Sequence, residues 1–277
     1  MDTLERTVPE ISKTPRTYLP ETFAVTDWAV IEPYFIELRD RSINSAAELE
    51  KWMLDRSELE SVLQEDMGWR YIKMTCDTTN EAATAAFQFF VEEIDPKMAP
   101  YDHELNKKLM ESPYVQELDQ EKYRIYLRSV KKALEIFREE NIPLNTEIST
   151  KQQQFAAISG AMTVTLDGEE VTLQRAADRL KNPDRAVREE AWRAIQNRRS
   201  QDWEKLDNLY TELVTLRHKV ATNAGFANFR DYMFAALGRF DYTPQDTFDF
   251  QDSIAEVVTP MISEFDRERK AELGLEE

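Results

Sequence analysis

Residues 162–199 read MTVTLDGEEVTLQRAADRLKNPDRAVREEAWRAIQNRR, and this stretch decides how the fold is interpreted. Apolar and hydroxyl residues alternate over 162–166, Asp167-Gly168 is a preferred two-residue turn, and Val171-Thr172-Leu173 resumes the alternation. Side chains that alternate in this way point to opposite faces of a strand. The stretch therefore predicts a β-hairpin over about 162–173.

Helix signals follow the hairpin at once. Thr172 is placed to cap a short helix that runs through Leu180. Asn182-Pro183-Asp184 then predicts a helix start, with Asn as the cap, Pro at the first position and Asp in the first turn. The spacing of that helix predicts a buried stripe made of Val187, Ala191, Trp192 and Ile195.

The remaining chain has the three- and four-residue apolar spacing that is typical of helices. We expect Pro33 in the first turn of its helix, a stop at Asp95-Pro96, and Thr146 as a helix cap. The predicted helices are 26–41, one from about Ser45, 77–94, 98–110, 117–140, 145–160, 202–223, a short one before Gly238, and one from Thr243 to about Leu273. Inward positions in two of them include Ile125, Trp203 and Tyr210. The fold class is mainly α, a multi-helix array with one small β-hairpin.

Prolines divide the chain into sections. Prolines 9, 15 and 20 predict an extended arm over 1–20, because each one interrupts helix hydrogen bonding. A boundary is expected near Glu139–Leu144, around Pro143. It separates an N-terminal helical domain, 21–142, from a helical segment with the hairpin, 143–277.

Composition limits the class of protein. The 277 residues carry a net charge of -18 without a basic face, which argues against nucleic acid and against an anionic membrane surface as partners. Cys76 is the only cysteine, so an intramolecular disulfide is impossible and a reducing compartment is favoured. The first 20 residues lack an apolar run of signal-peptide length, and no stretch reaches the roughly 20 apolar residues of a membrane helix. We expect a cytoplasmic protein.

The two histidines do not form a recognisable metal motif. Glu104 follows His103, but position 107 is Lys, so an HExxH helix is absent. His218 has neither a second His nor a carboxylate one helical turn away. A protein zinc site needs three or four ligands. We interpret both histidines and Cys76 as structural or surface residues, and we assign no catalytic, cofactor-binding or metal-binding residue.

Other chemical patterns have simple structural interpretations. Glu169 and Glu170 are adjacent on a strand and should point to opposite faces, as on a solvated hairpin edge. Arg193, Arg198 and Arg199 could hold an anion, but a helix face with compensating acidic residues explains them better. Most aromatic residues fall at helical spacing and are expected in cores, while a few could line a peptide site: Trp192, Trp203, Tyr210, Phe226, Phe229, Tyr232, Phe234, Phe240 and Tyr242.

Three segments together resemble a known family. AMTVTLDGEEVTLQRAADRLKNPDRAVREEAWRAIQNRR is similar to the region just upstream of the catalytic domain in oligoendopeptidase F, a thimet-oligopeptidase-like zinc metallopeptidase. LVTLRHKVATNAGFANFRDYMF and LGRFDYTPQDTFDF are similar to the continuation of that pattern, in the same order. The likeness runs from about 140 to 250.

The resemblance implies a bowl-like helical fold with two halves around a channel that admits short peptides. It also implies zinc held by the two His of an HExxH helix and a downstream Glu, with the motif Glu as general base. None of these positions can be matched in this chain. We therefore expect the N-terminal, pre-catalytic portion of a zinc oligoendopeptidase, leading into a catalytic domain. Alone it would form a wall of the substrate channel, bind no zinc and be inactive.

The alternative is a stand-alone α-helical binding or scaffold protein. The two hypotheses predict different surfaces: one half of a two-part fold should expose apolar faces that meet the other half.

Overall fold

The computed structural model describes residues 15–275, and the part of the predicted arm before residue 15 lies outside them. Residues 15–20 form no helix. They are held by Glu58, whose carboxylate accepts hydrogen bonds from the backbone N–H groups of Thr17, Tyr18 and Leu19 at 2.8, 3.0 and 2.8 Å.

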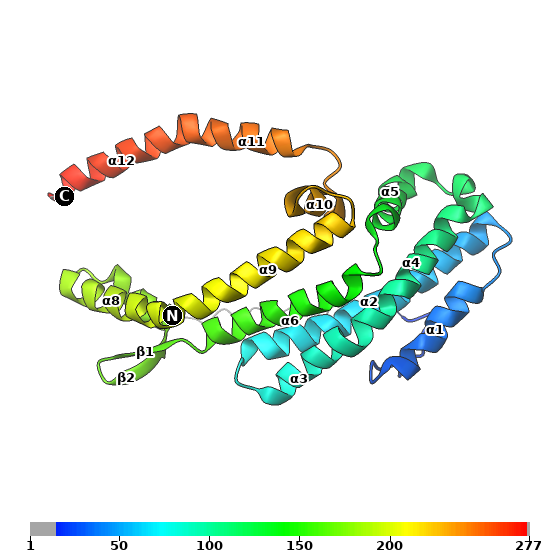
Figure 1. The fold of residues 1–277 in the computed structure, drawn as a ribbon, viewed down its shortest axis with the longest axis horizontal. Helices are drawn as coiled ribbons and strands as arrows, with labels where there is room; N and C mark the ends of the chain where they lie inside the picture. The colour runs from blue at the N-terminus through cyan, green and yellow to red at the C-terminus, as the bar shows by residue number, and fades with distance from the viewer. Residues whose placement is uncertain (1–14, 276–277) are drawn as a thin grey trace, which may run out of the picture.

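Helices dominate the described chain, as predicted (Figure 1). They are α1 (Trp28–Asp40), α2 (Ala46–Cys76), α3 (Glu81–Phe89), α4 (Asp95–Glu111), α5 (Gln120–Ile136), α6 (Asn141–Gly160), α7 (Leu173–Ala177), α8 (Arg185–Gln201), α9 (Trp203–Asn223), α10 (Phe229–Ala236), α11 (Pro244–Ser253) and α12 (Thr259–Glu272). Short π-helical turns, Phe90–Ile94 and Ile254–Val258, join α3 to α4 and α11 to α12. Short 3₁₀ turns are Pro113–Glu117 and Asp178–Lys181.

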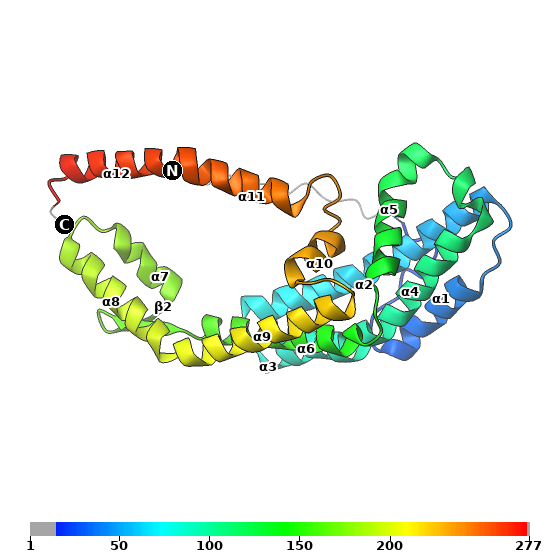
Figure 2. The ribbon, with the colours of Figure 1, turned by 45° about the horizontal axis from the view of Figure 1, so that its top comes forward.

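Two long helices form the spine of the molecule. α6 and α9 pack side by side (Figure 2). The N-terminal helices pack along one side of α6, so that Thr78, between α2 and α3, lies beside Gly160 at the C-terminal end of α6 (Figure 1). The hairpin with α7 and α8 lies beyond that end of the spine. α10 turns the chain at the end of α9, and α11 and α12 run back as an arm separate from the rest of the ribbon.

The N-terminal helices share one large core. Trp52 is its largest fully buried side chain, and its indole N–H donates to the backbone oxygen of Leu38 at 2.8 Å. This bond satisfies the one polar atom of the ring, so burial of the indole carries no unpaired donor. The core includes Ile31, Phe35, Leu38, Leu49, Trp52, Leu59, Leu63, Phe90, Ile94, Leu105 and Leu109.

The hairpin agrees with the sequence prediction. β1 (Thr163–Leu166) pairs antiparallel with β2 (Glu169–Thr172), with Leu166 opposite Glu169. Asp167 and Gly168 have φ of 54° and 82°, the positive values that a type I′ turn requires at both central positions. A second core lies beneath the hairpin and comprises Met162, Val164, Leu166, Leu173, Ala176, Ala191 and Ile195.

Three prolines behave differently from the prediction. Pro33 lies inside α1, which begins earlier because Asp27 caps it and accepts from the Val30 N–H. Asp95-Pro96 does not stop the helix, since a π turn precedes it and Pro96 falls at the start of α4. Pro143 lies in the first turn of α6, where helix N–H groups have no partner in any case. Thr146 is thus inside α6 and caps nothing; its hydroxyl donates to the Ile142 oxygen.

Capping and burial correct the predictions elsewhere. Asp184, not Asn182, caps α8 and accepts from the Ala186 N–H; Asn182 accepts from the Asp184 N–H in the preceding turn. Four aromatic or apolar residues predicted to be inward are exposed: Ile125, Trp192, Trp203 and Tyr210. Neighbouring elements cover only one side of each of these helices, so some residues of the predicted apolar stripe remain exposed.

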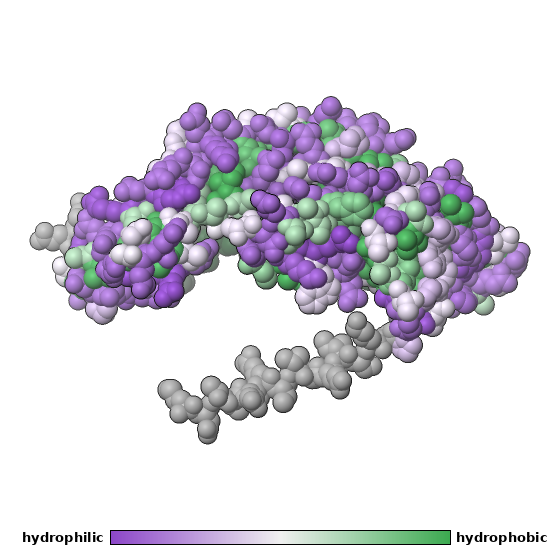
Figure 3. All heavy atoms as spheres, turned by 90° about the horizontal axis from the view of Figure 1, so that it is seen from below, coloured by the Kyte–Doolittle hydropathy of each residue, from purple (hydrophilic) through white to green (hydrophobic). Residues whose placement is uncertain are grey.

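Exposed apolar residues gather in patches among polar ones on the face shown in Figure 3. Within the described residues, no helix has both the length and the apolar character needed to cross a bilayer.

Candidate functional site

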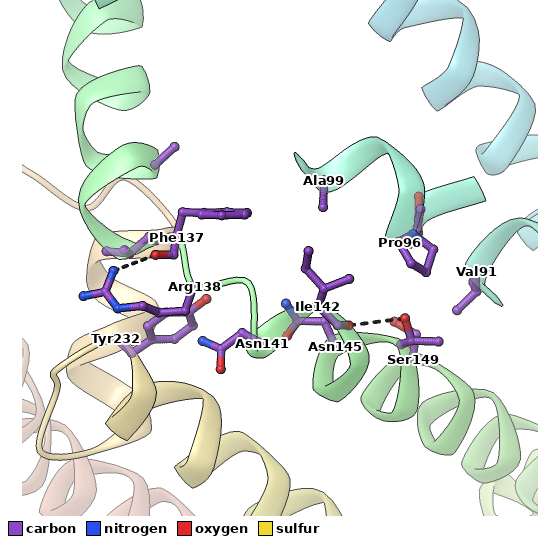
Figure 4. A pocket seen from close by; sticks show the side chains of 14 residues that line it. Val91, Pro96, Ala99, Phe137, Arg138, Asn141, Ile142, Asn145, Ser149 and Tyr232 are labelled. Atoms are coloured by element: carbon purple, nitrogen blue, oxygen red, sulfur yellow. Dashed lines mark hydrogen bonds between the residues drawn. The ribbon is translucent and has the colours of Figure 1, made fainter. Parts of the chain in front are cut away.

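A cavity of about 380 Å³ lies where α4, the α5–α6 junction and α10 meet (Figure 4). α4 contributes Asp95, Pro96 and Ala99, and Tyr232 comes from α10. The α5–α6 side is lined by Ala133, Ile136, Phe137, Arg138, Asn141, Ile142, Asn145, Thr146 and Ser149. Its walls therefore come from segments more than a hundred residues apart in the chain.

Two polar side chains fix the α5–α6 side of this cavity to the end of α9. Arg138 donates through Nε to the Asn223 oxygen at 3.0 Å and through Nη2 to the Ala224 oxygen at 3.4 Å. A cation at a helix C-terminus is favourable, since the last carbonyls have no helical partner. Asn141 is 4% exposed; its Nδ2 donates to the Val220 oxygen at 3.0 Å, and its Oδ1 accepts from Asn223 Nδ2 at 2.7 Å. These bonds tie the start of α6 to the end of α9, and α10, which carries Tyr232, packs on α9.

The cavity combines apolar walls with a few hydrogen-bonding groups. Burial raises the pKa of the Asp95 carboxyl to about 6, and burial also raises the pKa of Tyr232. Hydroxyls of Thr146 and Ser149 and the amide of Asn145 complete the polar set. The described residues that line the cavity include no Cys or His.

His103 lies behind this cavity and has a packing role. Its ring stacks on Phe137 with 4.1 Å between centroids and an angle of 17°. Phe137 also lines a second cavity, of about 410 Å³, together with Arg56, Glu60, Asp102 and His103 among others. Arg56 Nε donates to Glu60 Oε1 at 2.6 Å.

Asp102 is the most perturbed carboxyl in this second cavity. Burial, and then the negative charge of Glu60, raises its pKa to about 7, against the opposing effect of Arg56. Its Oδ1 is buried and finds no hydrogen-bond partner among residues 15–275.

The structure does not bring the remaining candidate residues together. His218 is exposed on α9, and Cys76 is exposed at the end of α2. Glu169 and Glu170 are both exposed, and Glu170 accepts from the Thr163 hydroxyl at 2.6 Å.

The arginines of α8 form pairs of the kind expected on a solvated helix. Arg193 pairs with Glu189 at 2.8 Å, and Arg198 pairs with Asp202 at 2.5 Å. Both pairs are four residues apart, so they join adjacent turns of one helix face.

A third, aromatic cavity lies at the hairpin end of the spine. Trp192 and Trp203 line this space of about 590 Å³, with Phe155 and Arg199. Core positions were predicted for both tryptophans; instead they are 53% and 65% exposed along the cavity wall.

The residues present do not fit the zinc site of the family that the sequence resembles. An HExxH helix needs two histidines four residues apart, and the chain has only His103 and His218. Among the residues that the structure describes, no three His, Cys, Asp or Glu side chains come close enough together to hold a metal ion.

Sequence reasoning missed the residues that build the two cavities around Phe137. Asp102 and Asn141 were assigned no role, Asp95 was interpreted only as part of a helix stop, and Tyr232 was one of nine aromatic residues named as core or peptide-site candidates. These residues line the two cavities only because the helices pack together. The only sequence pattern that could have identified them is weak: a polar residue within the apolar stripe of a helix.

Family models match most of the chain. The model of the peptidase M3 N-terminal domain matches residues 20–137, and the model of peptidase family M3 matches residues 179–277. The chain belongs to peptidase family M3. The second match begins just before α8 and continues to the end of the chain.

Solved structures agree on the fold. A protein assigned as oligoendopeptidase F from Bacillus anthracis strain Ames superposes with a TM-score of 0.85 at 21% identity, over 93% of this chain and 47% of that one. A second protein assigned as oligoendopeptidase F gives 0.85 at 24% identity, over 92% and 45%. PZ peptidase A, solved with an inhibitor, gives 0.85 at 21% identity, over 92% and 46%. No curated protein sequence matches the chain.

The chain thus spans somewhat less than half the length of the structures it matches. It has the helical fold of the N-terminal portion of these peptidases.

Proposed function

We propose that this chain forms one wall of the substrate channel in a zinc-dependent oligoendopeptidase that hydrolyses short peptides. The observation that carries the proposal is the match of 92–93% of the chain, at a TM-score of 0.85, to peptidases of about twice its length. In this proposal the chain contributes shape and binding groups, and the cavity under Tyr232 is one part of that wall.

The exposed apolar residues of α11 and α12 support this proposal. Phe250 of α11 and Ile262 and Phe265 of α12 are 66, 51 and 51% exposed, and Val257, in the π turn between the two helices, is 61% exposed. No residue of α11, of this turn or of α12 is buried. Apolar helix faces of this extent are typical of surfaces that pack against other protein. A two-part fold predicts such a face.

We propose that the chain supplies no zinc ligand and that the boundary between its two sections lies near 142. Zinc would be held by residues of the catalytic domain, where it would activate water for attack on the peptide bond. Residues of this chain would limit the length of peptide that can enter. We further propose a cytoplasmic location, because the single cysteine, Cys76, favours a reducing compartment. We also propose that the protein has no nucleic-acid partner, because its net charge is -18.

A direct experiment tests the absence of catalysis. The purified 277-residue chain should neither retain stoichiometric zinc after dialysis nor cleave a quenched fluorescent peptide. A His103→Gln, His218→Gln double variant serves as the matched control, and its zinc content should equal that of the parent. Chelator-sensitive cleavage by the parent chain would contradict the proposal.

A second experiment distinguishes a peptidase portion from a stand-alone scaffold. The genomic reading frame beyond codon 277 should continue into an HExxH helix. A stop codon at that point would favour the scaffold hypothesis.

A further inference from the structure

The arm formed by α11, the π turn Ile254–Val258 and α12 depends on very few contacts for its position. It buries no residue, and its close packing is along its own length. Figures 1 and 2 show it separated from the spine in both views. One side-chain contact joins the arm to α10: the Arg230 guanidinium lies over the Phe248 ring of α11, 5.2 Å from its centroid. The other contacts that can set the angle of the arm lie in residues 237–243, the elbow that joins α10 to α11.

The elbow has a defined conformation. The N–H groups of Leu237 and Arg239 donate back to the oxygens of Met233 and Phe234, at 2.9 and 3.0 Å. Gly238 has φ +64°, and a Cβ at this position would lie 3.3 Å from the Phe240 ring. The turn thus needs glycine for both its conformation and its space.

Arg128 of α5 is the residue that reaches the elbow from the N-terminal helices. Its guanidinium lies over the ring of Phe240, 4.3 Å from the centroid. Its Nη1 and Nη2 donate to the two carboxylate oxygens of Asp241 at 3.2 and 3.5 Å. α5 also packs against α10, so the contact continues an existing helix interface.

We propose that Arg128 is a latch that fixes the angle of the α11–α12 arm relative to the N-terminal helices. The latch joins a residue in the region matched by the M3 N-terminal model to a residue in the region matched by the M3 family model. Release of Arg128 lets the arm pivot about Gly238, and the arm then samples a range of angles. This inference does not require the proposed peptidase function.

The strength of the contact suits a latch that can open. The Arg128 side chain is 35% exposed and that of Asp241 is 81% exposed, so water screens the ion pair. The stacked guanidinium on Phe240 is the less solvated part and should contribute more. Together the two contacts should shift the ratio of latched to unlatched arms on the order of tenfold.

Pulsed electron paramagnetic resonance on the full 277-residue chain tests the latch. Cys76 is the only native cysteine and is exposed, so it takes one nitroxide label; Glu268→Cys, on the exposed α12, takes the other. The parent should give one narrow distance distribution. Arg128→Ala should broaden it, raising the unlatched share on the order of tenfold.

Matched variants separate the latch from a general loss of structure. Arg124→Ala removes an exposed arginine one turn earlier on α5 and should leave the distribution narrow. Phe240→Leu should reproduce the effect of Arg128→Ala, and Asp241→Asn should give a smaller effect, because Asp241 is the more exposed partner. Circular dichroism verifies that each variant is folded, and Asp241→Asn still tests the latch if Arg128→Ala does not fold.

Two results would overturn the proposal. One is a broad distribution in the parent, since the arm would then be unlatched with Arg128 in place. The other is an unchanged narrow distribution in Arg128→Ala and Phe240→Leu, since the elbow backbone and the Arg230–Phe248 contact would then hold the arm without Arg128.

Discussion

Asp102→Asn should make the chain more stable at pH 8 and remove part of its pH dependence. Burial and the charge of Glu60 raise the pKa of Asp102 in the folded chain to about 7, against 3.8 for an unperturbed carboxyl. The folded state therefore binds a proton between these two values that the unfolded state has released. It follows that the contribution of Asp102 to stability is fully present below about pH 4 and is lost as the pH rises through 7.

The magnitude follows from the width of that window. From pH 5 to the folded pKa is about two units, and each unit corresponds to about 1.4 kcal/mol, so Asp102 makes the chain about 2–3 kcal/mol less stable at pH 8 than at pH 5. An asparagine has the same shape and no charge. The difference in unfolding free energy between Asp102→Asn and the parent should thus increase by about 2–3 kcal/mol from pH 5 to pH 8.

Urea titrations at the two pH values, followed by far-UV circular dichroism, measure this difference. Glu104→Gln is the matched control, because Glu104 is exposed on the same helix, two residues away. Its difference from the parent should stay within about 0.5 kcal/mol at both pH values. The reasoning is refuted if the parent and Asp102→Asn show the same pH dependence of stability.

Hydrogen bonds to the backbone and the backbone conformation of two glycines allow further stability predictions. Burial raises the pKa of Glu58, but hydrogen bonds from the N–H groups of residues 17–19 outweigh it and lower the pKa overall. Glu58→Gln should therefore cost about 2–3 kcal/mol at pH 7 in urea titrations, and the difference should shrink as the pH falls through the folded pKa. Gly168→Ala should cost about 1 kcal/mol, because φ there is +82°. Gly68→Ala, inside α2 with no neighbouring atom within 4 Å, should instead add about 0.5–1 kcal/mol; equal effects at the two glycines would contradict the argument.

Local signals in the sequence predicted the elements well. Ser45 caps α2 and accepts from the Glu48 N–H, and Thr243 with Asp246 forms a reciprocal capping box at the start of α11. Asp167-Gly168 forms the expected turn. Each of these signals acts on backbone groups only a few residues away, so its effect does not depend on how the helices pack.

The prolines were harder to interpret because their effect depends on helix geometry. A proline removes one N–H, and that loss matters only where a helix would have used it. Pro143 falls in a first turn, and the π turn before Asp95 shifts the hydrogen bonds ahead of Pro96. A sequence shows the proline but does not show the register of the helix around it.

The candidate cavities could not be predicted for a different reason. Arg138 and Asn141 act on the end of α9, some eighty residues further along the chain. Such contacts follow from the side-by-side packing of α6 and α9, for which the sequence carries no motif. Family resemblance, carried most strongly by residues 162–199, indicated the fold without identifying any of these contacts.

The apolar spacing of α11 and α12 shows how local sequence pattern and tertiary packing combine. Periodicity predicts a helix with an apolar face, but it cannot say which part of the protein covers that face. α11, the π turn and α12 follow one another without a break, so hydrogen bonds along 244–272 support the arm internally, but they do not fix its angle to the rest of the chain. In the proposal above, the elbow and Arg128, together with the Arg230–Phe248 contact, position these helices in the described chain. If the arm packs against a catalytic domain, that interface takes over the positioning and Arg128 becomes one contact among many. The effect of Arg128→Ala should therefore be large in the 277-residue chain and small in any longer form in which the apolar face is covered.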